Sequence, residues 1–229
     1  MKKVMILALC VLSAVSCIHF RIGNELVSGG NSLKGTGDSA VASYELPDFD
    51  SVEISLHADV DFIQTDEGNS VEIRAQENLL EHLNFKVEDG CLKVCFDDGI
   101  KANYRDMDIV IRGRSLSALT VRGAADVDIM DGLKADNFDL LIQGAGDSDI
   151  VGLDAAKVSI TVQGAADISV DDLKCDDLSA LIQGAGDIKL NGEARNASLT
   201  IHGAGDINAS GLLTESVSKS VSGAGSIRL

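Results

Sequence analysis

The tetrapeptide Gly144-Ala145-Gly146-Asp147 is one of six copies of a motif that decides the fold of this chain of 229 residues. The other copies are Gly123-Ala124-Ala125-Asp126, Gly164-Ala165-Ala166-Asp167, Gly184-Ala185-Gly186-Asp187, Gly203-Ala204-Gly205-Asp206 and Gly223-Ala224-Gly225-Ser226. Successive first glycines are 21, 20, 20, 19 and 20 residues apart. A period of about twenty residues is typical of a protein built from stacked repeats.

Apolar residues alternate with polar ones on both sides of each motif. Two residues before each first glycine stand Val121, Ile142, Val162, Ile182, Ile201 and Val221. Beyond the motif the row resumes with Val127, Ser148, Ile168, Ile188, Ile207 and Ile227. This period of two predicts strands, and twenty residues cannot hold a useful helix beside two strands. We therefore predict an all-β fold, a right-handed parallel β-helix or solenoid with coils of about 20 residues.

Upstream of the repeats the same pattern is degenerate. The segment Ala58-Asp59-Val60-Asp61-Phe62 echoes Ala125-Asp126-Val127-Asp128-Ile129, which predicts a degenerate coil there. Strands are expected at residues 71–74 and 107–111, a short helix or turn at 77–83, and a hairpin around Asp89-Gly90. The predicted divisions are a signal peptide (1–16), a lipidated Cys with a flexible tether (17–46), an N-terminal β region (47–118) and a six-repeat solenoid (119–229).

The amino end is typical of an exported protein. Met1-Lys2-Lys3 precedes a mostly apolar run at residues 4–15, which is too short to span a bilayer. Ala14-Val15-Ser16-Cys17 resembles the bacterial lipoprotein box, which implies acylation of Cys17; ordinary signal cleavage is the alternative. A lipid on Cys17 would be the only membrane contact and would anchor the protein to the bacterial outer membrane, on its periplasmic or surface side.

Charge and cysteine content narrow the classes of partner and site. The net charge of −17 repels nucleic acid phosphates, so no nucleic acid partner is expected. Cys91 and Cys95 are about 13 Å apart on an extended strand, too far to form a disulfide with each other. We interpret these two residues and Cys175 as buried small hydrophobic side chains.

Four segments resemble one known family. They are the strand at residues 49–64, the segment Gln76-Glu77-Asn78-Leu79-Leu80, the hairpin at 88–94 and the repeated Gly-Ala-Gly-Asp. Together they resemble the auto-transporter adhesin "head GIN" domain family, over about residues 46–229. The resemblance implies a β-helical fold and a secreted or lipid-anchored bacterial envelope protein, and it brings no catalytic residues.

The repeat aspartates are the first candidate site. They are expected to stack on one edge of the solenoid, and they are Asp126, Asp147, Asp167, Asp187 and Asp206. Carboxylate oxygens are ligands that Ca²⁺ prefers, so a calcium site is one interpretation; no other cofactor is expected. The alternative, which we favour, is that the carboxylates accept backbone N–H bonds at the turns.

A strip of outward residues is the second candidate. It precedes the glycines and consists of Arg122, Gln143, Gln163, Gln183 and His202, with Leu141 and Leu181 in the neighbouring row. One interpretation is a docking face for an unknown protein or glycan at the cell surface. The other, which we favour, is an amide ladder that only stabilises stacking.

These observations predict a non-enzymatic, adhesin-like binding module of the cell envelope. A structural envelope protein without a dedicated ligand is the alternative. A polysaccharide-acting β-helix enzyme is disfavoured, because the chain has no Trp and its four His residues show no triad spacing. The strand edge at the last repeat could pair with a second copy, so a monomer or a weak dimer is expected.

Overall fold

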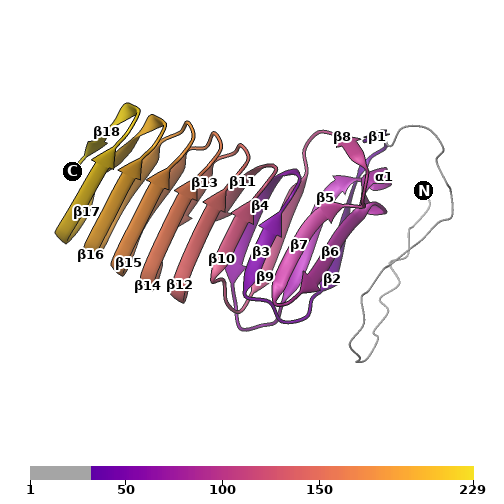
Figure 1. The fold of residues 1–229 in the computed structure, drawn as a ribbon. Helices are drawn as coiled ribbons and strands as arrows, with labels where there is room; N and C mark the ends of the chain where they lie inside the picture. The colour runs from indigo at the N-terminus through magenta and orange to yellow at the C-terminus, as the bar shows by residue number, and fades with distance from the viewer. Residues whose placement is uncertain (1–31) are drawn as a thin grey trace.

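The computed structural model describes residues 32–229, and the predicted signal peptide and Cys17 lie outside this part. Its strands stack into a solenoid in which each coil contributes to two facing sheets (Figure 1). One side contains β10 (Ala118–Val121) and the later parts of β12 (Leu133–Ile142), β14 (Leu153–Val162), β15 (Ile168–Ile182), β16 (Ile188–Ile201) and β17 (Ala204–Val221). The other contains β11 (Ala124–Ile129), β13 (Ser148–Val151), β18 (Ala224–Arg228) and the first parts of β15, β16 and β17. The predicted solenoid is confirmed.

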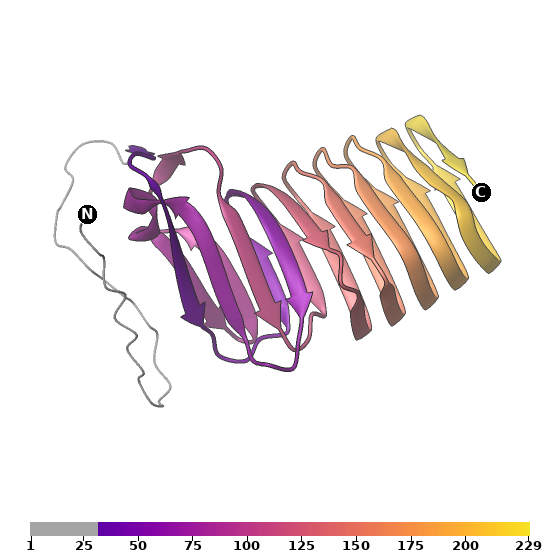
Figure 2. The same ribbon diagram turned by 180° about the vertical axis from the view of Figure 1, so that it is seen from behind.

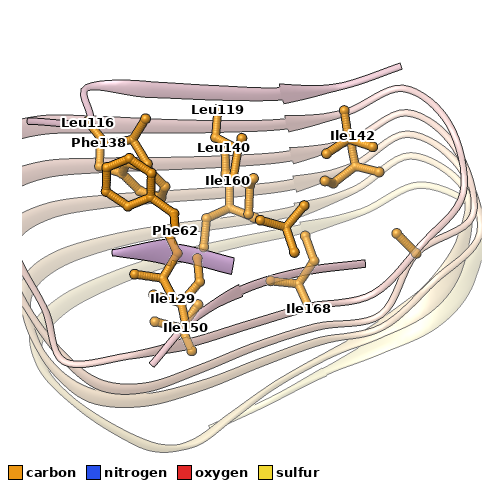
Figure 3. Close-up of a cluster of buried hydrophobic side chains, with 14 of the residues drawn as sticks. Phe62, Leu116, Leu119, Ile129, Phe138, Leu140, Ile142, Ile150, Ile160 and Ile168 are labelled. Carbon is orange, nitrogen blue, oxygen red and sulfur yellow. The ribbon is translucent and has the colours of Figure 1, made fainter. Parts of the chain in front are cut away.

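The core lies between the two sheets and is built from the predicted apolar rows. Coils pair in parallel and in register, so that Ile142 lies beside Val162 and Val162 beside Ile182. All three side chains are fully buried. Figure 3 shows Leu119, Leu140 and Ile160 stacked on one side of the interior and Ile129 and Ile150 on the other. Stacking converts rows that no single coil could bury into one continuous hydrophobic core.

The first coils do not stack in the order of the sequence. β3 (Ser51–Ile54) and β4 (His57–Gln64) pair with β10 and β11, with Asp59 opposite Asp126, which confirms the degenerate coil. β7 (Cys91–Phe96) and β9 (Asp108–Gly113) pair with the opposite edges of β3 and β4. The coil formed by β7 and β9 therefore stacks on the outer side of the coil formed by β3 and β4, although it comes later in the chain. The sheets continue without a break across residue 118, the predicted boundary between the N-terminal β region and the six-repeat solenoid.

Antiparallel strands close this end of the solenoid (Figure 2). β5 (Ser70–Gln76) and β6 (Leu83–Glu88) run antiparallel to β9 and β7. The helix α1 (Glu77–Leu80) and the β6–β7 hairpin lie where they were predicted, and Asp89 and Gly90 have φ of 51° and 78°. Two successive positive φ angles are those of a type I′ turn, whose twist suits a two-residue hairpin.

The tether prediction is wrong for residues 32–45. β1 (Ser32–Lys34) pairs with β8 (Lys101–Asn103), and β2 (Ser39–Glu45) pairs antiparallel with β5 over its whole length. The Asn78 side chain also accepts the Thr36 N–H at 2.8 Å and donates to the Lys34 carbonyl at 2.9 Å. The Gly- and Ser-rich composition concealed the alternation of Ala40, Ala42 and Tyr44, which gives β2 one face directed inward.

The burial of Cys91 and Cys95 was also predicted wrongly. Cys91 and Cys95 are half-buried on the outer side of β7, because Leu92 and Val94 occupy the inward positions. Cys175 is half-buried and packs against the core, and burial, followed by the nearby Asp176 and Asp177, raises the pKa of its thiol to about 11. A thiol with that pKa is protonated at neutral pH and is a poor nucleophile.

Candidate binding surfaces

The two sides of the solenoid carry different chemistry. The glutamine face is the outward surface of β10 and of the later parts of β12, β14, β15, β16 and β17. From β12 onward its outward positions hold Ser, Thr, Asn, Gln, Leu and His202, and its charged members are Asp139, Lys157 and Asp177. The aspartate face is the outward surface of β11, β13, β18 and the first parts of β15, β16 and β17. The solenoid therefore confines most of its charge to one side and to its corners.

The strip on the glutamine face forms a ladder of amides. Gln143 Nε2 donates to Gln163 Oε1 at 2.9 Å, and Gln163 Nε2 donates to Gln183 Oε1 at 3.1 Å. Arg122 instead forms an ion pair with Glu53 at 3.2 Å, and the His202 side chain makes no hydrogen bond within residues 32–229. These contacts support the stabilising interpretation for three members of the strip, and they hold the amides in fixed positions on an exposed surface.

Leu141 and Leu181 lie in the row beside the amide ladder. The register places Leu141, Thr161 and Leu181 side by side, and all three are half-buried. The face thus presents apolar and hydrogen-bonding groups in adjacent rows. The backbone that carries them is fixed by pairing to the coil on each side.

The repeat aspartates act as caps between coils. Oδ1 of Asp126, Asp147, Asp167 and Asp187 accepts the backbone N–H of the next aspartate along the stack, over 2.8–3.2 Å. Asp206 accepts the N–H of Ser226 at 2.7 Å and also its hydroxyl, and these bonds, with Arg228 near by, lower the pKa of Asp206. The contacts support the capping interpretation. Residues 32–229 contain no group of three or more His, Cys, Asp or Glu side chains placed to hold a metal ion.

A second row of carboxylates runs beside the caps in the first coils. Asp61, Asp128 and Asp149 lie side by side in successive coils. Burial raises the pKa of Asp128, and the charges of Asp149 and Asp61 raise it further. In later coils the same row holds Lys189 and Arg228. The aspartate face therefore changes from acidic to mixed charge along the stack.

Replacing Asp167 distinguishes a cap from a metal ligand. Asp167→Ala removes the acceptor for the Asp187 N–H, which lies 3.0 Å away, and is expected to lower the free energy of unfolding by about 1 kcal/mol. Asp167→Asn keeps an oxygen at that position and is expected to cost less than half as much. Urea unfolding with and without millimolar Ca²⁺ measures both effects. A calcium-dependent stabilisation that both variants abolish would contradict the capping role.

A shallow groove borders the glutamine face, and sequence reasoning missed it. It has a volume of about 590 Å³ and crosses β12, β14, β15, β16 and β17. Asp136, Ala156 and Asp176 have no partner in the strand register, which marks a corner in each coil. The groove is formed by the residues that follow this corner. Its two sides are rows of outward side chains, and its floor is the row of buried side chains between them. The recurring polar–apolar–polar triplets, such as 157–159 and 177–179, were the signal available in the sequence.

Two histidines lie near the end of the solenoid that the antiparallel strands close, and both have contacts within the fold. His57 Nδ1 lies 2.6 Å from the Ala124 carbonyl, and the Tyr104 hydroxyl donates to the His57 carbonyl at 2.8 Å. His82 lies 3.8 Å from Asp97. None of these contacts joins a histidine to a Ser or Cys side chain in the described residues. No helix in residues 32–229 is long and apolar enough to cross a membrane.

Solved structures share this fold at low sequence identity. A "putative adhesin" from Bacteroides fragilis NCTC 9343 is 21% identical, with a TM-score of 0.71, 86% of this chain covered and 99% of that chain. A "putative lipid binding protein" from Parabacteroides distasonis ATCC 8503 is 20% identical, with a TM-score of 0.74 and coverages of 86% and 98%. A "putative adhesin" from the same organism is 18% identical, with a TM-score of 0.60 and coverages of 86% and 99%. At these identities the likeness establishes the fold alone.

The family assignment rests on the sequence. No curated protein matches the chain significantly. One family matches residues 48–229, which include the degenerate coil, the antiparallel strands β5 and β6, and all six repeats. The resemblance seen in the motifs is thereby confirmed. The chain belongs to the family described as "Putative auto-transporter adhesin, head GIN domain".

Proposed function

We propose that this protein is a non-enzymatic, adhesin-like binding module of the bacterial cell envelope, held at the outer membrane by a lipid on Cys17. The family description and the adhesin-like neighbours support a surface or envelope role. The observation that carries the proposal is a rigid face whose outward positions from β12 onward hold only three charged side chains, with a net charge of −1, on a chain with a net charge of −17. A protein that needed only solubility would have no reason to keep one side so free of charge.

The glutamine face has the properties of a recognition surface. The amides of Gln143, Gln163 and Gln183 are held by hydrogen bonds to one another on a backbone that is fixed by the stacked coils, so little of their side-chain entropy is lost when a partner binds. The half-buried Leu141 and Leu181 add apolar contact beside the hydrogen-bonding Gln row. Donors and acceptors of this kind suit a neutral, hydrogen-bonding partner better than a charged one.

The end of the solenoid that the antiparallel strands close, called the cap below, is the end nearest to Cys17 along the chain. Ser32, the first described residue, lies at the cap end, opposite β17 and β18 (Figure 1). Cys17 stands 15 residues earlier, a length that reaches at most about 50 Å. A lipid on Cys17 would therefore connect the membrane to the β1 end of the solenoid over a distance of at most about 50 Å.

The decisive test compares two variants with the same change in charge. The full-length chain, purified in detergent, is added to intact Gram-negative cells and to immobilised envelope fractions, and binding is followed to saturation. Gln163→Lys combined with Leu181→Lys is expected to weaken binding at least 10-fold, because both residues lie exposed or half-exposed on the glutamine face. Asp149→Lys also changes the net charge by +2, by replacing one negative charge with one positive charge on the aspartate face, and is expected to bind as the parent does.

Two outcomes would contradict the proposal. Binding that never saturates in either preparation would favour the structural envelope role. An equal loss in both variants would mean that overall charge, and not the glutamine face, governs the interaction. Melting curves by circular dichroism confirm that each variant is folded.

A further inference from the structure

The groove beside the glutamine face has two polar banks and a narrow apolar floor. One bank is a row of serines, Ser159, Ser179, Ser198 and Ser218. The other bank holds Asn137, Lys157, Asp177, Asn196 and Ser216. The floor contains Val158, Leu178 and Ala197, which are almost completely buried. The groove thus crosses five coils and runs along the axis of the solenoid.

Many hydrogen-bonding groups of the banks are free to meet a ligand. Within residues 32–229 the hydroxyls of Ser159 and Ser179 make no hydrogen bond. Only Asn196 to Asp177, at 2.9 Å, and a long Ser218 to Ser198 contact, at 3.4 Å, join groups along a bank. Hydroxyls both donate and accept, and amides do the same, so the lining can pair with another surface rich in hydroxyls.

The charge of the lining points to an uncharged ligand. Asp139, Asp177 and Lys157 are its charged members, and they leave a net charge of −1 on a chain of net charge −17. An anionic polymer would be repelled by the chain as a whole, and a cationic one would find more carboxylates on the aspartate face. A neutral polymer is neither repelled by the net charge of the chain nor attracted to the aspartate face.

The periodicity of the banks matches a linear polymer. Coils stack about 4.8 Å apart, so each bank offers one polar side chain at every such step. The sugar residues of an extended, β-1,4-linked polysaccharide recur at close to this spacing. A peptide strand would need backbone partners, but the N–H and C=O groups of β14, β15 and β16 already pair with their neighbours.

We propose that the groove binds an extended, uncharged polysaccharide that lies parallel to the solenoid axis, with one sugar residue on each coil. This inference rests on the proposed binding function and specifies the partner. Hydroxyls of the sugars pair with the serine and amide banks, and their C–H faces contact the Leu178 row. The groove lining has no aromatic side chain on which a sugar could stack, so each sugar contributes little and affinity grows with chain length.

The test uses β-1,4-linked disaccharides, trisaccharides and hexasaccharides of glucose, mannose and xylose, with a hexamer of galacturonic acid as the charged control. Isothermal titration with the full-length chain is expected to show at least one neutral hexasaccharide binding 10-fold or more tightly than its disaccharide, and no binding of the acidic hexamer. Ser179→Arg fills the middle of the groove and is expected to weaken hexasaccharide binding at least 10-fold. Ser222→Arg makes the same change outside the groove and is expected to leave it unchanged.

The outcomes separate the two proposals. If no neutral hexasaccharide binds at millimolar concentration, or if Ser179→Arg binds as the parent does, the groove inference is overturned. The binding to cells and envelope fractions, measured on the same preparation, then decides the broader function. Saturable cell binding that needs Gln163 and Leu181 would preserve the adhesin-like role without the groove, and its absence would remove both.

Discussion

Gly164→Ala is expected to lower the free energy of unfolding by about 4 kcal/mol or more. A Cβ at residue 164 would lie well inside 3.0 Å of the Gly144 carbonyl oxygen in the preceding coil. That carbonyl cannot move aside, because it accepts the Ala165 N–H at 3.0 Å. Relief requires neighbouring coils to separate, which would break backbone hydrogen bonds and open the core between them.

The requirement at Gly164 is for space and not for an unusual backbone angle. Gly164 is not among the residues with positive φ, whereas Gly146 and Gly186 are. Ala165→Ser, at the exposed neighbouring position, is therefore a matched control and is expected to change stability by less than about 0.5 kcal/mol. Urea unfolding followed by circular dichroism compares the two. A loss below 1 kcal/mol in Gly164→Ala would mean that the coils are not packed as closely as described.

The repeated fold could be predicted because every repeat has the same two sequence features. The first glycine permits close approach at the turn, and the Val and Ile rows on each side alternate with a period of two. Each coil repeats these features, so a weak signal in one is reinforced by the others. Even the degenerate coil could be recognised, because Asp59 and Asp61 echo Asp126 and Asp128 at the exact register that the structure shows.

The cap could not be predicted to the same extent, because its pairings are not periodic. Nothing in the sequence of β7 and β9 indicates that they stack beneath β3 and β4, although they come later in the chain. β2 was missed for a related reason. Its inward side chains, Ala40 and Ala42, are too small to distinguish a strand from a Gly- and Ser-rich tether.

The candidate surfaces were predicted by position more successfully than by shape. Period two placed Gln143, Gln163 and Gln183 outward and in line, and their hydrogen bonds follow from that placement. The groove depends instead on a corner at Asp136 and its counterparts, where a residue without a register partner interrupts the alternation. Such a corner is set by how the whole coil closes, so local pattern alone does not reveal it.

Ser148→Val is expected to raise the free energy of unfolding by about 2 kcal/mol. Ser148 is 2% exposed, and its hydroxyl has no hydrogen-bond partner within the described residues. It lies in register between Val127 and Ile168, in a row where the other coils bury β-branched apolar side chains. Valine removes the unpaired hydroxyl and adds buried methyl groups in a shape that the row already accepts. Ser220→Val, on the exposed surface, is the control and is expected to change stability by less than about 0.5 kcal/mol.

Ser148→Ala separates the two contributions to this gain. Alanine removes the hydroxyl without adding volume, so a gain with alanine measures the cost of the unpaired polar group, and the further gain with valine measures how much space the serine leaves unfilled. The backbone N–H of Ser148, which donates to the Asp167 carbonyl at 3.0 Å, is the same in both variants. A loss of stability in both would contradict the prediction, because it would mean that the hydroxyl is paired, by a buried water for instance, and contributes to the fold.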